Sequence, residues 1–279
     1  MPNILILANE TIGGKALLDE VLRRRDEAGG DVRFHVVVPK TRPRHGNVIY
    51  DEAVRDGAQV RVDLMLSFMR EEDIEATGEV GDEDPFNAAL DAMHERQVDE
   101  IVVSTLPATA SGWLRRDIID RLREETGLPV EHVVVDLAKH GYPFRVTLVV
   151  ANLTATSPEL TRRLRQLGEE EPRRYIVVVP QDSTDGSAAA AARERLTTLL
   201  ESLQADGFVA AGMIGDPDPY TAAMNAVQFF NISEIVISTL PEDSSRWVCD
   251  KLVDRVQTAA NKPVEHVEAS QPAATGAEA

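Results

Sequence analysis

Cysteine is almost absent from this chain of 279 residues, which contains only Cys249. A single cysteine excludes a disulfide within the chain and any cysteine-rich metal site, and it is typical of proteins in a reducing compartment. The first residues also lack the basic-then-apolar pattern of a secretory leader. We therefore expect a cytoplasmic protein.

Basic residues are also scarce, because 29 Lys and Arg stand against 47 Asp and Glu, a net charge of -18. Both halves of the chain are acidic, whereas nucleic acids and anionic membrane surfaces are bound by basic surfaces. No apolar run approaches the ~20 residues of a membrane-spanning helix. We expect neither a nucleic-acid nor a membrane partner. The hydrophobic content of 43% suffices for about two domains with cores of their own.

The sequence contains one long internal repeat. Residues 100–133 align without a gap on residues 234–267, with 16 identities in 34 positions at an offset of 134. So long a period excludes a solenoid and indicates two copies of one domain. We place the domains at residues 1–140 and 141–269, followed by a tail, 270–279, that has no apolar face and should be disordered.

Each copy alternates short apolar segments with helical patterns. In the first copy the strand candidates read ILILA, VRFHVVV, IEATGEV, EIVVST and VEHVVV, and their nearly continuous apolar character is typical of strands covered on both faces. Strand alternating with helix predicts an α/β fold of two tandem doubly wound domains, each with a five-stranded parallel sheet. We expect the fourth helix of each copy to begin at Trp113 and Trp247, with Ser111 and Ser245 as N-caps.

This organisation resembles that of tandem universal stress proteins over the whole chain outside the tail. The resemblance rests on the strand–helix order, the doubled unit, and the Gly-Asp-x-Asp-Pro sequences at 81–85 and 215–219. It rests also on an acidic residue followed by an apolar strand that ends in a short polar loop, and the segment ILILANETIGGKALLDEV is most similar to the actinobacterial branch. The resemblance implies a non-catalytic stress-response or regulatory function.

Nucleotide-binding members of that family carry a glycine-rich phosphate loop, Gly-x2-Gly-x9-Gly-Ser/Thr, which this chain lacks in both copies. Proline at the second position removes an N–H donor, and Asp117 at the third opposes phosphate charge. The family's aspartate after the first strand is replaced by asparagine in both copies. ATP is therefore disfavoured, and the cofactor is unknown. The spacing falls on Ser104, Pro107, Asp117 and Ile118, and on Ser238, Pro241, Lys251 and Leu252.

Polar side chains nevertheless follow the first and fourth strands of each copy, where open α/β sheets bind ligands. A helix N-terminus near them could attract a phosphate or a carboxylate without glycines. The competing interpretation is that these hydroxyl groups cap helices and turns. The candidate ligand-binding residues are Asn9, Thr11, Ser104, Thr105 and Ser111 in the first copy, and Asn152, Thr154, Ser238, Thr239 and Ser245 in the second.

Other reactive residue types fit structural roles. Asp84 and Asp218 each precede a proline, the pattern of an N-cap followed by the first helical residue. The histidines show no metal-ligand spacing, so we expect no metal site. Cys249 aligns with Arg115, which argues against a shared nucleophile and leaves no catalytic candidate. The tryptophans are interpreted as anchors of the fourth helix, or alternatively as part of a ligand cleft.

Three functions remain, of which a non-catalytic regulatory protein with a degenerate nucleotide site is the first. The alternative is a sensor that binds a nucleotide or another anion at the carboxyl ends of the strands. An enzyme would need an acid–base pair or nucleophile that the repeat does not supply. The fifth strands, 130–133 and 264–267, are identical, so we predict that they pair within one chain as a pseudo-dimer. A homo-oligomer or a protein partner is also open.

Overall fold

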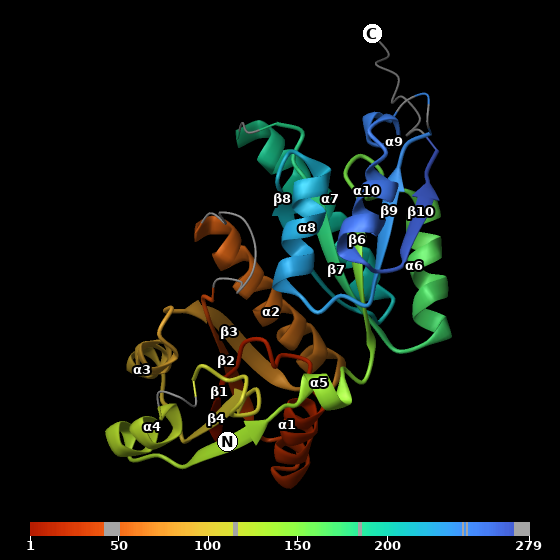
Figure 1. Ribbon diagram of the computed structural model, residues 1–279. Helices are drawn as coiled ribbons and strands as arrows, with labels where there is room; N and C mark the ends of the chain where they lie inside the picture. The colour runs from red at the N-terminus through yellow and green to blue at the C-terminus, as the bar shows by residue number, and fades with distance from the viewer. Residues whose placement is uncertain (42–50, 114–116, 184–185, 242, 244, 271–279) are drawn as a thin grey trace. The chain divides into compact units, whose positions relative to one another are not determined.

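The computed structural model describes residues 1–41, 51–113, 117–183, 186–241, 243 and 245–270 (Figure 1). The chain forms two compact units, Met1–Pro143 and Phe144–Ala279, so the division lies three residues beyond the boundary placed from the repeat. Residues 271–279 of the expected disordered tail lie outside the described residues. Among the described helices, none has the length and apolar character needed to cross a bilayer.

The first unit contains the five expected strands in one sheet, ordered β3-β2-β1-β4-β5 and parallel at every pairing. Its elements are β1 (Asn3–Leu7), α1 (Lys15–Glu27), β2 (Arg33–Pro39), α2 (Asp51–Glu71), β3 (Glu75–Gly81), α3 (Pro85–Glu95), β4 (Glu100–Thr105), α4 (Ile118–Thr126), β5 (Val130–Val134) and α5 (Leu137–His140).

The second unit repeats this topology with the sheet order β10-β9-β6-β7-β8, again all parallel. Its elements are β6 (Arg145–Val150), α6 (Pro158–Glu170), β7 (Arg173–Pro180), α7 (Gly186–Ala205), β8 (Val209–Gly215), α8 (Pro219–Phe229), β9 (Glu234–Thr239), α9 (Arg246–Cys249), α10 (Leu252–Ala260) and β10 (Val264–Glu268). The predicted α/β fold class, with two doubly wound five-stranded domains, is thus observed.

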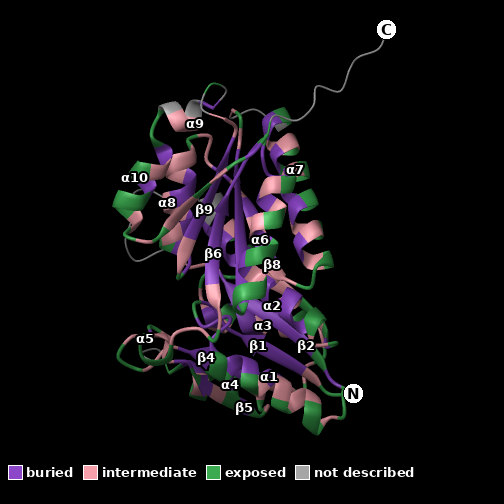
Figure 2. Ribbon diagram, turned by 90° about the vertical axis from the view of Figure 1, so that its right-hand side faces the viewer, coloured by how far each residue is buried: buried purple, intermediate pink, exposed green. Residues whose placement is uncertain are grey.

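Helices cover both faces of each sheet, as the nearly continuous apolar strands require. In the first unit, Leu5 and Leu7 of β1 pack with Ala88 of α3 and Leu122 of α4. In the second, the opposite face is buried by α6 and α7, whose leucines pack around Tyr175. Figure 2 shows the inner strands β1, β2, β4, β6, β7 and β9 mostly buried between helices, whereas the edge strands β3 and β10 contain no buried residue. β5 and β10 are the last strands of their sheets, and their mutual pairing stays a prediction.

The fourth helix differs from the expected one. We expected this helix to begin at Trp113, but α4 begins at Ile118, after Asp117 in a left-handed conformation (φ 48°). In the second unit α9 is separated from α10 by Lys251 (φ 50°). A left-handed residue cannot continue a right-handed helix, and neither Asp117 nor Lys251 is a glycine that would have indicated the break.

The helices that follow the third strands begin as predicted. The Asp84 carboxylate accepts from Phe86 N (2.8 Å), and that of Asp218 accepts from Thr221 N (3.0 Å). Asp82 and Asp216, which the sequence left unexplained, accept from the backbone N–H of these two caps (both 2.8 Å). These aspartates therefore close the turn that leads into each helix.

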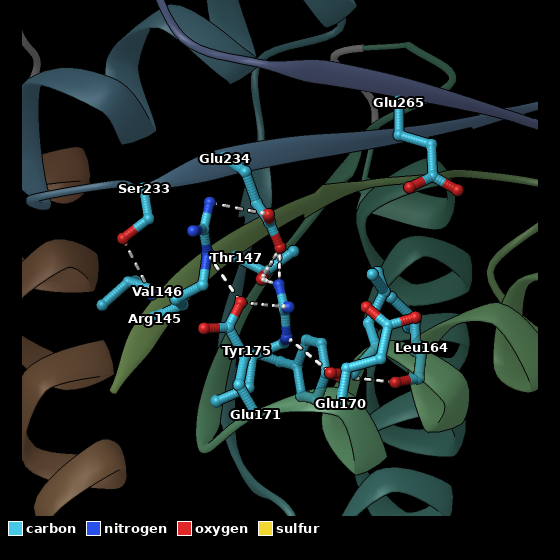
Figure 3. Close-up of polar contacts among 12 residues, drawn as sticks. Arg145, Val146, Thr147, Leu164, Glu170, Glu171, Tyr175, Ser233, Glu234 and Glu265 are labelled. Atoms are coloured by element: carbon cyan, nitrogen blue, oxygen red, sulfur yellow. Dashed lines mark hydrogen bonds and ion pairs between the residues drawn. The ribbon is translucent and has the colours of Figure 1, made fainter. Parts of the chain in front are cut away.

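A polar cluster occupies the amino ends of β6, β7 and β9 (Figure 3). The Glu234 carboxylate forms an ion pair with Arg173, contacts Arg145 Nη2 (3.1 Å) and accepts from Thr147 Oγ1 (2.7 Å). The Arg173 side chain is only 2% exposed and also donates to Leu167 O (3.0 Å). These partners satisfy the hydrogen bonds of the buried guanidinium.

His35 of β2 is a second buried polar group, confined to the first unit. Its Nδ1 accepts from Arg96 Nε (3.1 Å) and lies 2.8 Å from Thr77 Oγ1, while Nε2 lies 3.3 Å from Glu79 Oε1. Because arginine only donates, the neutral ring carries its proton on Nε2, facing Glu79. Burial, and then the charge of Arg96, lower the pKa of His35 below its ordinary 6.5, against the opposing effects of Glu79 and Glu95.

We expect the free energy of unfolding of the first domain to decrease as the pH falls below about 6.5. The unfolded chain takes up a proton at the ordinary pKa, whereas the native state resists it until the pH reaches the lower folded pKa. His132, whose pKa is also lowered by burial and then by Arg123, acts in the same direction. Urea unfolding at pH 7.5 and 5.5 should show less pH dependence in His35→Gln than in the wild type. An unchanged pH dependence in His35→Gln would contradict the attribution of this loss of stability to His35.

Candidate functional site

The first unit has a pocket of about 390 Å³ at the carboxyl ends of β1, β2 and β4. The strand order reverses between β1 and β4, so the following segments leave toward opposite faces, and crevices at such points bind ligands in open α/β sheets. The lining residues are Asn9, Glu10, Thr11, Lys40, Thr41, Glu83, Pro85, Ser104, Thr105, Leu106, Ser111, Gly112 and Trp113.

All five residues predicted for the first copy line this pocket. Asn9 and Thr11 come from the loop after β1, Ser104 and Thr105 end β4, and Ser111 follows in the next loop. Thr11 Oγ1 donates to Ser104 O (3.3 Å), which ties the two loops together. The structure therefore brings the predicted residues together at one site, although it does not test whether they bind a ligand.

Asn9 has the most informative hydrogen bonds. Its Nδ2 donates to Pro39 O (2.8 Å) and to Thr41 Oγ1 (2.6 Å). Because Pro39 offers only a carbonyl oxygen here, the amide nitrogen must face it, and Oδ1 faces the other way. Asn9 is only 6% exposed, and within the described residues its Oδ1 has no hydrogen-bond partner. A buried acceptor without a donor costs about 1–3 kcal/mol.

In the second unit, both the nitrogen and the oxygen of the equivalent Asn152 side chain are hydrogen-bonded. Asn152 Nδ2 donates to Asp182 Oδ1 (2.7 Å), and its Oδ1 accepts from Arg195 Nη1 (2.6 Å). Arg195 is also paired with the Asp182 carboxylate at 3.2 Å. Thr154 Oγ1 donates to Ser238 O (3.0 Å), the counterpart of the Thr11–Ser104 bond. The two copies thus share the threonine contact with the fourth strand. They differ in the hydrogen bonds of the asparagine side chain.

Two further predicted residues of the second unit, Thr239 and Ser245, have defined roles. Thr239 Oγ1 donates to Leu240 O and lies 2.8 Å from His266 Nε2. The single hydroxyl proton is used on Leu240, so His266 must donate to Thr239 and is not a base toward it. Ser245 Oγ accepts from Val248 N (3.4 Å), as expected of an N-cap of α9.

Thr105 and His132 form the equivalent pair in the first unit, with Oγ1 and Nε2 2.8 Å apart. The capping prediction for Ser111 concerns residues 114–116, which lie outside the described residues. Ser104 Oγ and Ser238 Oγ are both buried without a hydrogen-bond partner among the described residues. These serines therefore give no evidence that one domain binds a ligand and the other does not.

Sequence reasoning missed the contribution of the loop after β2. Lys40 and Thr41 line the pocket, and their counterparts Gln181 and Asp182 follow β7. The identical segments VVVP, which end in Pro39 and Pro180, align Thr41 with Asp182. This alignment could have indicated that the two loops differ in charge. Trp113 packs on the core beneath α3 and α4 and also lines the pocket. The ring therefore has the contacts expected of an anchor and also lies at the candidate site.

Among the described residues that line the pocket, Glu10 and Glu83 are acidic and Lys40 is basic. Two backbone amides of the loop after β4 are used within the loop, because Ala110 N and Ser111 N both donate to Pro107 O (2.8 Å each). Among the described residues, no group of three His, Cys, Asp or Glu side chains is arranged to hold a metal ion.

The sequence matches no model of a protein family and no curated protein sequence. Among solved structures, the chain is similar to a universal stress protein from Archaeoglobus fulgidus DSM 4304, with 14% identity and a TM-score of 0.34 over 97% of each chain. It is also similar to a functionally unknown protein from Pseudomonas aeruginosa PAO1, with 13% identity and a TM-score of 0.29 over 97% of this chain and 93% of that one.

Proposed function

We propose that the protein is a non-catalytic regulatory protein of the universal stress protein type, in which the first domain binds a small ligand and the second does not. The observation that carries the proposal is the difference between the two asparagines. Asn9 Oδ1 is buried without a partner in the described structure beside a pocket of about 390 Å³, whereas Asn152 Oδ1 already accepts from Arg195. A ligand-binding site in the first domain accounts for the Asn9 oxygen, which is unpaired among the described residues. A degenerate site in the second domain accounts for the paired Asn152 oxygen.

The family assignment in this proposal is supported by the repeat and by the sheet order shared by the two domains. The absence of catalysis is supported in the second domain by the Thr239–His266 geometry, because Thr239 Oγ1 already donates to Leu240 O and the imidazole then donates to Thr239. A hydroxyl nucleophile needs a base that accepts its proton. In this geometry His266 is not such a base for Thr239.

We expect the natively purified chain to carry or accept one small molecule, bound in the first domain. Native mass spectrometry would identify a co-purified molecule and its stoichiometry. Asn9→Leu should abolish the binding, because it replaces the buried amide with a side chain that cannot hydrogen-bond, whereas the matched variant Asn152→Leu should leave it unchanged. Equal loss in both variants would contradict a site confined to the first domain.

ATP is the informative reference ligand in the same experiment. Proline at position 107, the internal use of the Ala110 and Ser111 amides, and the carboxylates of Glu10 and Glu83 all disfavour a triphosphate. Calorimetric titration with micromolar ATP should show no saturable heat. A tight stoichiometric isotherm would overturn the assignment of a degenerate nucleotide site.

A further inference from the structure

We infer that the ligand of the first domain presents a planar nitrogen donor, such as an amidine or an aromatic amine, to Asn9 Oδ1. The inference rests on the proposed function and adds the chemical class of the ligand. In the second domain, the side-chain oxygen of the equivalent Asn152 accepts from Arg195, and this contact indicates which kind of donor such an oxygen binds.

The hydrogen bonds of Asn9 and Asn152 correspond in part, although Asn9 Nδ2 also donates to Pro39 O (2.8 Å) and Asn152 Oδ1 also accepts from Arg195 (2.6 Å). Each Nδ2 donates to the second residue after the proline that ends the neighbouring strand, Thr41 or Asp182. Each asparagine is followed two residues later by a threonine that donates to the end of the fourth strand. The one missing partner in the first domain is the guanidinium N–H that Arg195 supplies to Asn152 Oδ1 (2.6 Å).

The first domain has an arginine at the equivalent position, but it is used differently. Arg61 of α2 precedes Arg195 by 134 residues, the offset of the repeat, and its Nη1 donates to Gly57 O (3.3 Å). Arg195 is held beside Asn152 by the Asp182 carboxylate. Thr41, in place of Asp182, offers no charge to hold a guanidinium there. A planar N–H group from a ligand is the chemical equivalent of the missing partner.

The rest of the pocket fits such a ligand. Trp113, Pro85 and Leu106 supply apolar surface for a flat ring, and among the described lining residues the acidic Glu10 and Glu83 stand against the basic Lys40. An amidine on an aromatic ring combines these properties. Benzamidine is therefore a suitable probe, and benzoate is its control, with the same shape, the opposite charge and no N–H.

The two tryptophans let each domain be observed separately in the full chain. Trp113 belongs to the first domain, and Trp247 holds the equivalent repeat position in the second. In ¹H–¹⁵N spectra, with the two indole signals assigned from Trp247→Phe, benzamidine should shift the Trp113 signal and leave that of Trp247 in place. For so small a molecule we expect a Kd on the order of 1 mM, at least tenfold below that of benzoate.

Two variants decide the outcome. Asn9→Leu should remove the Trp113 shift, and Arg195→Ala, which leaves Asn152 Oδ1 and Asp182 open, should add a benzamidine-dependent shift of Trp247. Benzoate binding as tightly as benzamidine overturns the inference, as does a shift that survives Asn9→Leu or an Arg195→Ala protein without a second site. If benzoate binds better and Asn9→Leu abolishes it, only the ligand class is wrong. If the wild-type chain binds neither probe and carries no co-purified molecule, the proposed site itself is wrong.

Discussion

Replacing Glu234 with alanine should lower the free energy of unfolding of the second domain by about 3 kcal/mol. The substitution removes the main counter-charge of Arg173, whose side chain is 2% exposed and cannot move into water without opening the domain. Breaking a buried ion pair from one side costs about 3–5 kcal/mol, because a charge is left behind. We expect the lower end of that range, since Glu171 still contacts Arg173 Nη2 (3.1 Å).

Glu100→Ala is the matched control in the first domain. Glu100 holds the same repeat position and pairs with Arg24, which is 16% exposed and also keeps Glu20 as a partner (2.7 Å). This loss should cost about 1 kcal/mol, as for partly solvated pairs. Urea unfolding followed by Trp247 fluorescence in a Trp113→Phe background would measure the second domain, and the reverse background would measure the first. Equal shifts of the two midpoints would mean that burial of Arg173 is not the cause.

Gly212→Ala should destabilise the second domain by about 2–3 kcal/mol. A Cβ at this position of β8 would lie 2.4 Å from Val177 O and 2.6 Å from Leu196 Cδ1. The carbonyl belongs to the backbone of the neighbouring strand, which cannot withdraw without disturbing the sheet. Overpacking of this kind typically costs about 1–3 kcal/mol, and a clash with backbone belongs in the upper part of that range.

Gly78→Ala tests the same position in the first domain. There the added Cβ would lie 2.7 Å from Val62 Cγ1, the end of a side chain, and 3.0 Å from Val36 O. We expect a cost of about 1 kcal/mol, because a side chain yields more easily than a backbone carbonyl. Thermal unfolding of both variants should show the larger decrease in melting temperature for Gly212→Ala. A larger decrease for Gly78→Ala would show that the backbone contact is not decisive.

The fold was accessible from the sequence because its signals are local. Strands such as β1 and β4 are short continuous apolar runs. The repeat shows the same succession of strands and helices in both copies. The break before α4 was not accessible, because a left-handed Asp117 carries no glycine signature and the apolar spacing continues through it. The extra helix α5 is only four residues long and has no buried residue, so no periodic pattern indicated it.

The candidate site was predictable in part for a related reason. Asn9, Thr11, Ser104 and Thr105 follow strands directly, so their convergence follows from parallel topology alone. The Asn152–Asp182–Arg195 contacts join three segments that only the folded backbone brings together, and the consequences of Thr41 in place of Asp182 appear only there. The difference between the domains therefore emerged from side-chain geometry rather than from pattern.

The left-handed residues before α4 and α10 also bear on ancestry. Asp117 and Lys251 carry opposite charges, yet their backbone angles agree within a few degrees (φ 48°, ψ 39° and φ 50°, ψ 42°). Such a conformation costs a residue with a side chain roughly 1 kcal/mol, so two independent acquisitions of it are a poor explanation. A bend that predates the duplication indicated by the repeat accounts for both residues with one event. On that account the backbone shape has been kept while its side chain changed.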